Sequence, residues 1–500
     1  MTDQIQIADL MARSGVGFGT SGARGRVADM GAPVCYAYTL AFLQHLAEHH
    51  GLQPGSAVAL AGDLRASTSA IMSACAAAVV DAGHRPLNGG FLPAPAIALY
   101  GLERGIPSLM VTGSHIPDDR NGIKFNTAAG EILKADEEGI RAQTVVVPDR
   151  IAGNALPPVD PAPRARYLQR YLDFFGATAL AGMRVAVYEH SGVARDLLGE
   201  VLAGLGAEVI RLGRSDIFMP VDTEAIRPED VELARGWARE PGFDAIVSTD
   251  GDADRPLIGT EHGEWLRGDV VGVLCAEALG IQALATPVSS NSVVEACGRF
   301  AAVTRTRIGS PYVIAGMQAL QAAGQSSVAG YEANGGFLLA TPIERDGRVL
   351  EPLPTRDALL PILALLARAR AEGVPLSALP ARLPPRFTAS DRLKNFPTEQ
   401  SRALLAQLQA GGVPAMEALF GDLCGKIADI DTTDGLRLRF ANDEIVHLRP
   451  SGNAPEFRCY NEAASETRAG ELNRACLQIL KGISSEGSDQ GNRLIRIELK

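Results

Sequence analysis

The sequence has no CxxC pair, and its seven cysteines are scattered between Cys35 and Cys476. An odd number of dispersed cysteines does not build a disulfide framework, which excludes a disulfide-rich secreted fold and indicates a reducing compartment. No apolar run is long enough to span a membrane. The first ten residues, MTDQIQIADL, also lack the basic and then apolar pattern of a secretory signal. We therefore expect a soluble, cytoplasmic protein.

Positive charge is in deficit, because 47 Lys and Arg residues stand against 58 Asp and Glu residues and leave a formal net charge of −11. Such a balance disfavours nonspecific binding to nucleic acid and to anionic membranes, and we expect neither as a partner. A small anionic substrate remains allowed, since a cleft can gather positive charge locally against the sign of the whole chain.

The 500 residues predict several domains. Two proline-rich stretches, 155–166 and 374–387, are typical of linkers, because proline restricts its own backbone and that of the preceding residue. Strand-like runs such as SAVALAG and MRVAVYEH alternate with helix-like runs, which predicts three related α/β domains, and a smaller α+β domain follows the second linker. The predicted domains are 1–156, 165–264, 265–373 and 385–485.

Near the N-terminus, Gly17, Gly19 and Gly22 have the GxGxxG spacing of a dinucleotide-binding turn. That turn must follow a strand, whereas the preceding IADLMARS is helical or irregular in character, so we reject NAD binding. The stretch GTSGARGR is instead predicted to be a flexible glycine-rich loop that carries Arg24.

Ser114 lies in TGSHIPDDRNGIKF, at the end of the strand-like run SLMVTG. A serine hydrolase would need a G-x-S-x-G elbow, which T-G-S-H-I-P does not match, and an adjacent histidine such as His115 rarely reaches its neighbour with triad geometry. Strand ends commonly carry α/β active sites. On the serine alone, however, a polar turn is the favoured interpretation.

The stretch STDGDADRPLIG places Asp250, Asp252 and Asp254 two residues apart, directly after a strand-like run. Three carboxylates this close repel one another unless a cation neutralises them, and oxygen ligands suit Mg²⁺ or Ca²⁺. An EF-hand is disfavoured, because Arg255 occupies the position that needs glycine and strands flank the loop. We favour a metal-binding loop over a solvated acidic turn.

Two further loops offer ligand-binding groups. The stretch LRPSGNAPEFR supplies guanidinium, hydroxyl, amide and backbone donors, and arginine forks match phosphate oxygens, so a phosphate-binding loop is favoured over an exposed structural one. Its candidate residues are Arg449, Ser451, Gly452, Asn453 and Arg458. In AGYEANGGF, Glu332 and Asn334 suit vicinal sugar hydroxyls, although a simple hairpin would also explain this stretch.

Taken together and in this order, the loops resemble those of the α-D-phosphohexomutase family, the phosphomannomutase and phosphoglucomutase group. TGSHIPDDRNGIKF is similar to its phosphoserine loop, DGDADR to its metal loop, GYEANGG to its sugar loop and RPSGNAPEFR to its phosphate loop. The resemblance covers nearly the whole chain. It implies three related α/β mixed-sheet domains and a smaller C-terminal α+β domain around a central cleft.

The resemblance also implies roles for residues. Ser114 would be the phosphoryl carrier, His115 would support its loop, and Mg²⁺ would bind the Ser114 phosphate with Asp250, Asp252 and Asp254. Arg24, Lys124 and Arg255 would stabilise the phosphoryl oxygens or assist proton transfer, Glu332 and Asn334 would bind the sugar, and the Arg449 loop would hold the nonreacting phosphate. A phosphorylated hexose is the expected substrate, with hexose 1,6-bisphosphate as intermediate and activator. We expect a monomer or small homo-oligomer.

Some residues depart from the usual family pattern. The sugar loop has Gly336 where many members carry histidine, which removes one candidate acid or base. Mannose phosphate is the favoured substrate, with glucose or glucosamine phosphate as alternatives. Outside the class, the alternatives are a catalytically silent phosphosugar-binding protein and a metal-dependent phosphatase that uses Asp250 as its nucleophile.

Overall fold

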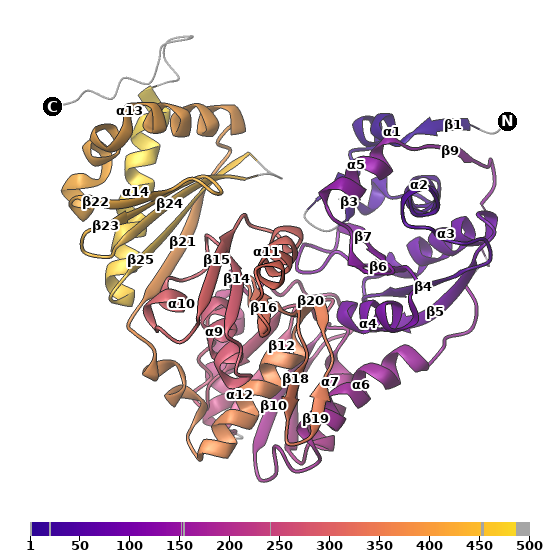
Figure 1. The fold of residues 1–500 in the computed structure, drawn as a ribbon, viewed down its shortest axis with the longest axis horizontal. Helices are drawn as coiled ribbons and strands as arrows, with labels where there is room; N and C mark the ends of the chain where they lie inside the picture. The colour runs from indigo at the N-terminus through magenta and orange to yellow at the C-terminus, as the bar shows by residue number, and fades with distance from the viewer. Residues whose placement is uncertain are drawn as a thin grey trace. The chain divides into compact units, whose positions relative to one another are not determined.

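The computed structural model describes residues 3–19, 22–151, 153, 156–240, 242–451 and 455–486. It divides into two compact units, the first made of Met1–Ala285 and Gly309–Pro380 and the second of Thr286–Ile308 and Ala381–Lys500. Both units contain sheets with helices packed against them (Figure 1).

The N-terminal part of the first unit is a mixed sheet with helices on it. Its elements are β1 (Asp3–Gln6), α1 (Ile7–Ser14), β2 (Gly17–Phe18), β3 (Ala23–Arg26), α2 (Ala32–His49), β4 (Ala57–Gly62), α3 (Thr68–Asp81), β5 (Arg85–Phe91), α4 (Ala94–Arg104), β6 (Ser108–Val111), β7 (Arg120–Thr127), β8 (Gly130–Glu131), α5 (Lys134–Ala142) and β9 (Thr144–Val147). The strand order is β2-β3-β7-β6-β4-β5, with β8 on β7. Strand β4 is parallel to β5 and β6, whereas β7 is antiparallel to β6 and β3.

The helices bury both faces of this sheet. Val58 and Leu60 of β4 belong to one apolar core with residues of α2 and α3, and α4 packs against β4 and β6. Because β4 and β6 are covered on both sides, their sequences are continuous apolar runs rather than alternating ones. The carboxyl ends of these two strands therefore open directly into polar loops, which carry the candidate site.

The middle part of the first unit repeats the same plan. Its elements are α6 (Ala162–Phe175), β10 (Arg184–His190), α7 (Arg195–Gly204), β11 (Glu208–Arg214), α8 (Pro228–Arg239), β12 (Ala245–Thr249) and β13 (Pro256–Gly259). The strand order is β11-β10-β12-β13, with β13 antiparallel to β12 and the other pairs parallel. The turn from β12 to β13 contains the three aspartates.

The last part of the first unit holds a third sheet. Its elements are α9 (Gly268–Ala278), β14 (Ala283–Pro287), α11 (Ser310–Ala322), β16 (Val328–Tyr331), β17 (Phe337–Leu339), β18 (Ile343–Arg345), β19 (Arg348–Leu350), β20 (Leu353–Asp357) and α12 (Leu359–Glu372). Within this unit the strand order is β14-β16-β17-β20, where β14 and β16 are parallel and the other pairs antiparallel. Strands β18 and β19 form a separate hairpin.

The second unit is an antiparallel sheet with two helices on one face. Its elements are α10 (Val293–Ala296), β15 (Ala302–Thr306), β21 (Phe387–Lys394), α13 (Thr398–Cys424), β22 (Ile427–Asp431), β23 (Leu436–Phe440), β24 (Ile445–Pro450), β25 (Glu456–Ala463) and α14 (Glu466–Glu486). The main strand order is β21-β25-β24-β23-β22. On β23, Leu436, Leu438 and Phe440 face α13 and α14 in a single apolar core. Backbone angles break α13 at Gly412, two residues before Pro414.

The predicted fold class is confirmed: three α/β parts with mixed sheets are followed by a C-terminal sheet with helices. The proline-rich stretches are less linker-like than expected, because α6 begins within the first and short 3₁₀ turns at Leu376–Ala378 and Pro380–Arg382 occupy the second. Proline favours helix starts, since its missing N–H is unneeded there. The domain boundaries stay predictions, and the strand-like tail at 492–500 lies outside the described residues.

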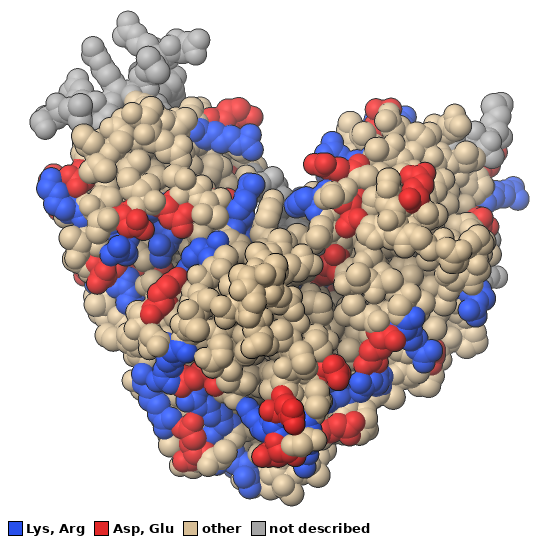
Figure 2. Space-filling view, viewed as in Figure 1, with Lys and Arg blue, Asp and Glu red and all other residues tan. Residues whose placement is uncertain are grey.

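The surface drawn in Figure 2 and the described helices are those of a chain with charges of both signs and no long apolar run. On the face drawn in Figure 2, Lys and Arg side chains are interspersed with Asp and Glu side chains and do not gather by sign. A search of the described helices finds none with the length and apolar character that a membrane crossing requires.

Candidate active site

Ser114 lies in a tight turn after β6. Its side chain is buried against the turn between β12 and β13, which carries Asp250, Asp252 and Asp254 and is called the aspartate loop below. Its hydroxyl donates a hydrogen bond to Asp250 Oδ2 over 2.6 Å. Its backbone has a φ of 54°, in the left-handed region that non-glycine residues rarely adopt. The Ser114 N–H donates to Thr112 Oγ1 at 2.7 Å, which helps to hold this conformation. The hydroxyl therefore has a fixed direction, toward the carboxylate cluster.

The three aspartates of the β12–β13 turn are all buried, and each offers a carboxylate oxygen within 4.8 Å of the others. Among the described residues, Oδ1 of Asp252 and Oδ1 of Asp254 are buried without a hydrogen-bond partner. Buried carboxylate oxygens are costly unless a cation or donor meets them. Orphaned oxygens and an all-oxygen donor set fit a hard divalent cation.

Three buried cations also face this cluster, and one of them, Arg255, places its Nε 3.6 Å from Asp254 Oδ1 and 3.9 Å from Asp250 Oδ2. Lys124 of β7 donates to Asp252 Oδ2 at 2.6 Å and to Asp254 Oδ2 at 2.5 Å. Arg356 of β20 contacts Asp254 Oδ2 at 2.9 Å and Glu332 Oε2 at 2.8 Å. Burial would raise the pKa of Asp254, but Arg356 and Lys124 outweigh it and hold that pKa far below its usual range. Burial, with Asp252 and Asp254 nearby, raises the pKa of Asp250 well above its usual value.

His115 is adjacent to the serine but is engaged elsewhere. Its Nδ1 lies 3.4 Å from the Ser114 hydroxyl and accepts a hydrogen bond of 2.8 Å from Arg255 Nη1. Burial, followed by the charge of Arg255, lowers the pKa of His115 to about 3. Since an arginine donor already occupies the Nδ1 lone pair, the ring cannot take the serine proton as a hydrolase base does.

Arg24 corrects one sequence prediction, because it lies on strand β3 and not in a flexible loop. It pairs in register with Gly122 of β7, where an added Cβ would approach the Arg24 side chain to 2.9 Å. Burial and then Arg255 lower the Arg24 pKa to about 10. Glycine-rich sequence predicts flexibility, but pairing with β7 fixes this backbone. Thr20 and Ser21 of the same stretch lie outside the described residues.

The predicted sugar loop is the turn of the β16–β17 hairpin. Glu332 is buried in its ion pair with Arg356, and through that arginine it joins the aspartate cluster. The side-chain oxygen of Asn334 accepts a hydrogen bond of 3.0 Å from the Gly336 N–H, which closes the turn. Thr223 holds the Asn334 carbonyl at 2.8 Å. Both candidate residues are thus fixed in place.

The predicted phosphate loop belongs to the second unit. Arg449 is the second-last residue of β24 and donates to Asp434 Oδ2 at 2.9 Å, and it pairs in register with Arg458 of β25. The Ser451 N–H donates to the Glu456 carbonyl at 2.9 Å. Two arginines therefore lie side by side at this strand end. Gly452 and Asn453, the other candidates, lie outside the described residues.

Sequence reasoning missed two buried arginines of the first unit. Arg356 links Asp254 to Glu332, and Arg65 binds carbonyl oxygens of the Ser114 loop, Ser114 itself included. The only signal for Arg65 was its place just after the apolar run of β4, in the stretch GDLRAS. Arg356 lies on β20, and no feature of the sequence around it indicated a part in the site.

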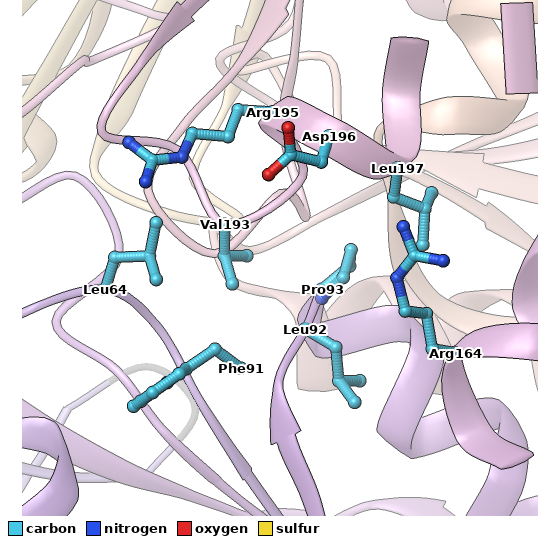
Figure 3. Close-up of a pocket in the computed structure, with 9 residues that line it drawn as sticks. All are labelled: Leu64, Phe91, Leu92, Pro93, Arg164, Val193, Arg195, Asp196 and Leu197. Atoms are coloured by element: carbon cyan, nitrogen blue, oxygen red, sulfur yellow. The ribbon is translucent and has the colours of Figure 1, made fainter. Parts of the chain in front are cut away.

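A cavity of about 230 Å³ is lined by the residues drawn in Figure 3. Its lining comes from the connection after β4, the end of β5 and the residues after it, Val193 and the first turn of α7, with Arg164 from α6. Val193 in this lining donates its N–H to the Gly251 carbonyl at 3.1 Å, and Ala94, next to the lining, donates to the Asp252 carbonyl at 2.9 Å. Neither Ser114 nor any of the three aspartates lines the cavity, so it is not part of the carboxylate cluster.

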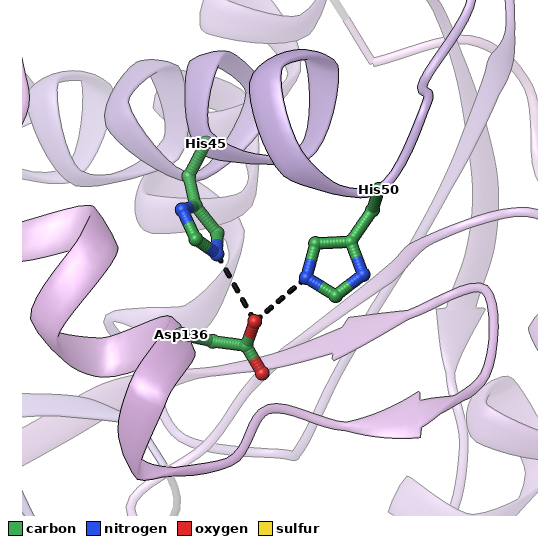
Figure 4. A group of neighbouring side chains, drawn as sticks. All are labelled: His45, His50 and Asp136. Carbon is green, nitrogen blue, oxygen red and sulfur yellow. Dashed lines mark hydrogen bonds and ion pairs between the residues drawn. The ribbon is translucent and has the colours of Figure 1, made fainter.

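A second cluster of metal-ligating side chains joins α2 to α5 (Figure 4). Nε2 of His45 and Nε2 of His50 lie 3.0 Å and 2.7 Å from the same oxygen of Asp136. The other Asp136 oxygen accepts the Leu133 N–H at 2.8 Å, as a capping group at the start of α5 does. Two imidazole nitrogens and one backbone N–H therefore surround this carboxylate and account for it structurally.

Comparison with known proteins identifies relatives over most of the chain. Models described as phosphoglucomutase/phosphomannomutase α/β/α domains I, II and III match residues 15–146, 165–263 and 267–387. A phosphomannomutase of Sinorhizobium fredii is 45% identical over 93% of this chain and 98% of its own. A phosphomannomutase of Salmonella muenchen is 42% identical over 95% and 97%. A solved phosphoglucomutase/phosphomannomutase family protein from Burkholderia thailandensis shares the fold with a TM-score of 0.69, at 20% identity over 93% and 96%.

Proposed function

The chain belongs to the phosphoglucomutase/phosphomannomutase family, and we propose that it interconverts mannose 6-phosphate and mannose 1-phosphate through a phosphorylated Ser114. The observation that carries the reaction is the Ser114 hydroxyl held 2.6 Å from Asp250 at a buried cluster of three aspartates. The two phosphomannomutases at 45% and 42% identity support mannose as the sugar.

The phosphoryl group moves twice in this reaction. The C1 hydroxyl of mannose 6-phosphate bonds to the phosphorus on Ser114, the bond to Ser114 Oγ breaks, and Oγ receives the proton that the sugar hydroxyl loses. Ser114 Oγ then bonds to the phosphorus of the C6 phosphate in the resulting mannose 1,6-bisphosphate. The bond from that phosphorus to the C6 oxygen breaks, and the C6 oxygen takes the proton that Oγ loses, which leaves mannose 1-phosphate. Transfer of this kind depends mainly on positioning and charge neutralisation.

The residues of the first unit supply both. Asp250 accepts the hydrogen bond of the Ser114 hydroxyl and so fixes the direction of the carrier oxygen. Arg24 is partly buried beside Arg255 and brings positive charge for the transferred oxygens. Asp250, Asp252 and Asp254 would hold Mg²⁺, which when bound neutralises charge on the phosphoryl oxygens.

The second unit would bind the phosphate that does not react. Arg449 and Arg458 lie on adjacent strands, and their guanidinium groups suit a phosphate dianion. In the first unit, Glu332 and Asn334 would bind the sugar hydroxyls.

The test is a ³¹P NMR time course with Mg²⁺ and a trace of hexose 1,6-bisphosphate. Mannose 6-phosphate, glucose 6-phosphate and glucosamine 6-phosphate are supplied in separate samples. We expect a 1-phosphate signal that grows fastest from mannose. Faster growth from glucose or glucosamine would reassign the sugar, and absence of any 1-phosphate would reject the mutase.

The Ser114→Ala variant separates the carrier from a phosphatase. We expect it to lose at least about 10⁴-fold in turnover, because no group remains to carry the phosphoryl between the two oxygens. A variant that still releases inorganic phosphate at the wild-type rate would instead indicate an Asp250 nucleophile.

A further inference from the structure

We infer that Arg65 is a positioning residue for phosphoryl transfer, one that fixes the backbone of the phosphoserine loop and ties it to the aspartate loop. This inference rests on the proposed role of Ser114. Arg65 follows β4, and its side chain is fully buried.

Every N–H of the Arg65 guanidinium has an acceptor. Nε donates to Asp63 Oδ2 at 3.1 Å. The other four donors reach backbone carbonyls of the serine loop: those of Ser114 at 2.9 Å, Ile116 at 2.6 Å, Pro117 at 2.7 Å and Arg120 at 3.0 Å. A guanidinium has five N–H donors and an ammonium has three, so lysine at this position would leave carbonyls unmet.

Asp63, the ion-pair partner of Arg65, also helps to hold the N–H of the strained Ser114. The Thr112 hydroxyl donates to Asp63 Oδ2 at 2.8 Å, and the oxygen of that hydroxyl, Thr112 Oγ1, accepts the Ser114 N–H. The N–H and the C=O of Ser114 are therefore both fixed through Asp63 and Arg65. A positive φ at a non-glycine residue persists only where surrounding contacts determine it, and these contacts do so.

The guanidinium of Arg65 lies close to two further residues. It approaches Gly113 so closely that an added Cβ there would stand 2.5 Å from Arg65 Cζ. Its Cζ also lies 4.0 Å from the centre of the Phe218 ring. That ring borders Gly251 of the aspartate loop, where an added Cβ would be 3.3 Å from Phe218 and 2.7 Å from the Ser114 carbonyl. Arg65 thus sets the Ser114 hydroxyl against Asp250 without touching the reacting atoms.

A loosened loop would admit water to phospho-Ser114. In that side reaction a water oxygen bonds to phosphorus, the bond to Ser114 Oγ breaks, and Oγ takes a proton from the water, which releases inorganic phosphate. The rate of this release relative to mutase turnover does not depend on how much of a sample is folded. The ratio therefore reports on positioning, whereas loss of fold alone would lower both rates together.

The experiment compares Arg65→Lys and Gly113→Ala with Arg85→Lys, a matched control at an exposed arginine that donates to the Gly55 carbonyl. Turnover is normalised to phospho-Ser114 measured by intact mass, and KM and inorganic phosphate release are recorded. For both test variants we expect kcat to fall about 100-fold with KM within about threefold, and phosphate release per turnover to rise about tenfold. The control should match the wild type.

Gly113→Ala keeps Arg65 and displaces it, so it tests the inference even where Arg65→Lys does not fold. Folded variants with wild-type kcat would overturn the inference, and so would a lower kcat with an unchanged ratio of phosphate release to turnover. Failure of the proposed function looks different, because the wild type itself would then make no sugar 1-phosphate.

Discussion

At the scale of single residues, the candidate site is a cluster of opposed buried charges. The carboxylates of Asp252 and Asp254 would be unstable in a dry interior by themselves, and Lys124 and Arg356 offset their charge. Burial would lower the pKa of Lys124, but Asp252 and Asp254 outweigh it and raise that pKa above its usual value. The lysine therefore stays charged, and it contacts only one oxygen of each aspartate.

The oxygens that Lys124 leaves open lead to the first residue-scale prediction. Oδ1 of Asp252 has no hydrogen-bond partner among the described residues, which makes it available to Mg²⁺. We expect Asp252→Asn to raise the Mg²⁺ concentration for half-maximal activity by at least about tenfold, because an amide brings no charge to the metal. The measurement is initial rate against Mg²⁺, with Asp422→Asn on an exposed part of α13 as the control. An unchanged Mg²⁺ requirement would remove Asp252 from the ligand set.

Sequence alone could predict the site residues whose neighbours form a recognisable loop. Ser114 and Asp250 are brought to hydrogen-bond distance as expected, because both end buried strands whose carboxyl ends meet. Arg65 and Arg356 could not be predicted, since their partners are backbone carbonyls or carboxylates far along the chain. Such contacts depend on tertiary packing and leave no local pattern.

At the scale of secondary-structure elements, hydrophobic pattern predicted most of the fold. Strands β4 and β10 fall within the expected stretches SAVALAG and MRVAVYEH, because short continuous apolar runs are typical of buried strands. Strand β3 was missed, since ARGR has no apolar alternation and its pairing partner β7 lies almost a hundred residues away. Short polar strands of this kind, paired on both sides, are defined by their neighbours more than by their own sequence.

An acid-stability prediction belongs to the packing of α2 on α5. Burial would raise the pKa of Asp136, but hydrogen bonds from His45, the Leu133 N–H and His50 outweigh it and hold that pKa below its usual value. A lowered folded pKa means that the stabilising contribution is full at neutral pH and is lost as pH falls below about 4. The melting temperature of Asp136→Asn should therefore be below that of the wild type at pH 7. The difference between the two melting temperatures should become smaller as the pH is lowered toward 3.5.

The measurement is thermal unfolding followed by circular dichroism at several pH values. Asp9→Asn on α1 is the control, since this aspartate is exposed and lies in the same N-terminal part of the first unit. A gap that stays constant from pH 7 to 3.5 would show that the Asp136 carboxylate contributes nothing through its charge.

At the scale of the whole molecule, the chain leaves the first unit at Thr286 and re-enters it at Gly309. The segment between these points, Thr286–Ile308, is hydrogen-bonded to the rest of the second unit. Ser292 Oγ donates to Glu462 at 2.6 Å, and the Ile308 N–H donates to Asp434 at 3.0 Å. No contiguous boundary drawn from composition could anticipate this, because the partners lie more than a hundred residues later. Asp434 also accepts a hydrogen bond from Arg449, so it links this segment to the predicted phosphate loop.

This division leads to a whole-molecule prediction, that the two units contribute to different kinetic constants. The groups proposed to transfer the phosphoryl lie in the first unit, whereas Arg449 lies in the second. Arg449→Lys keeps a positive charge beside Asp434 but removes the planar fork that matches phosphate. We expect KM for mannose 6-phosphate to rise about tenfold, with Ser114 still phosphorylated to the wild-type extent.

Steady-state kinetics and the intact mass of the purified protein provide the two readouts. Arg439→Lys is the matched control, because this half-exposed arginine lies on β23 of the same sheet and contacts Asp443. A rise in KM without loss of phospho-Ser114 would assign Arg449 to substrate binding alone. If phosphorylation of Ser114 fell in step with the rise in KM, Arg449 would act on the transfer itself, and the separation of roles between the units would be wrong.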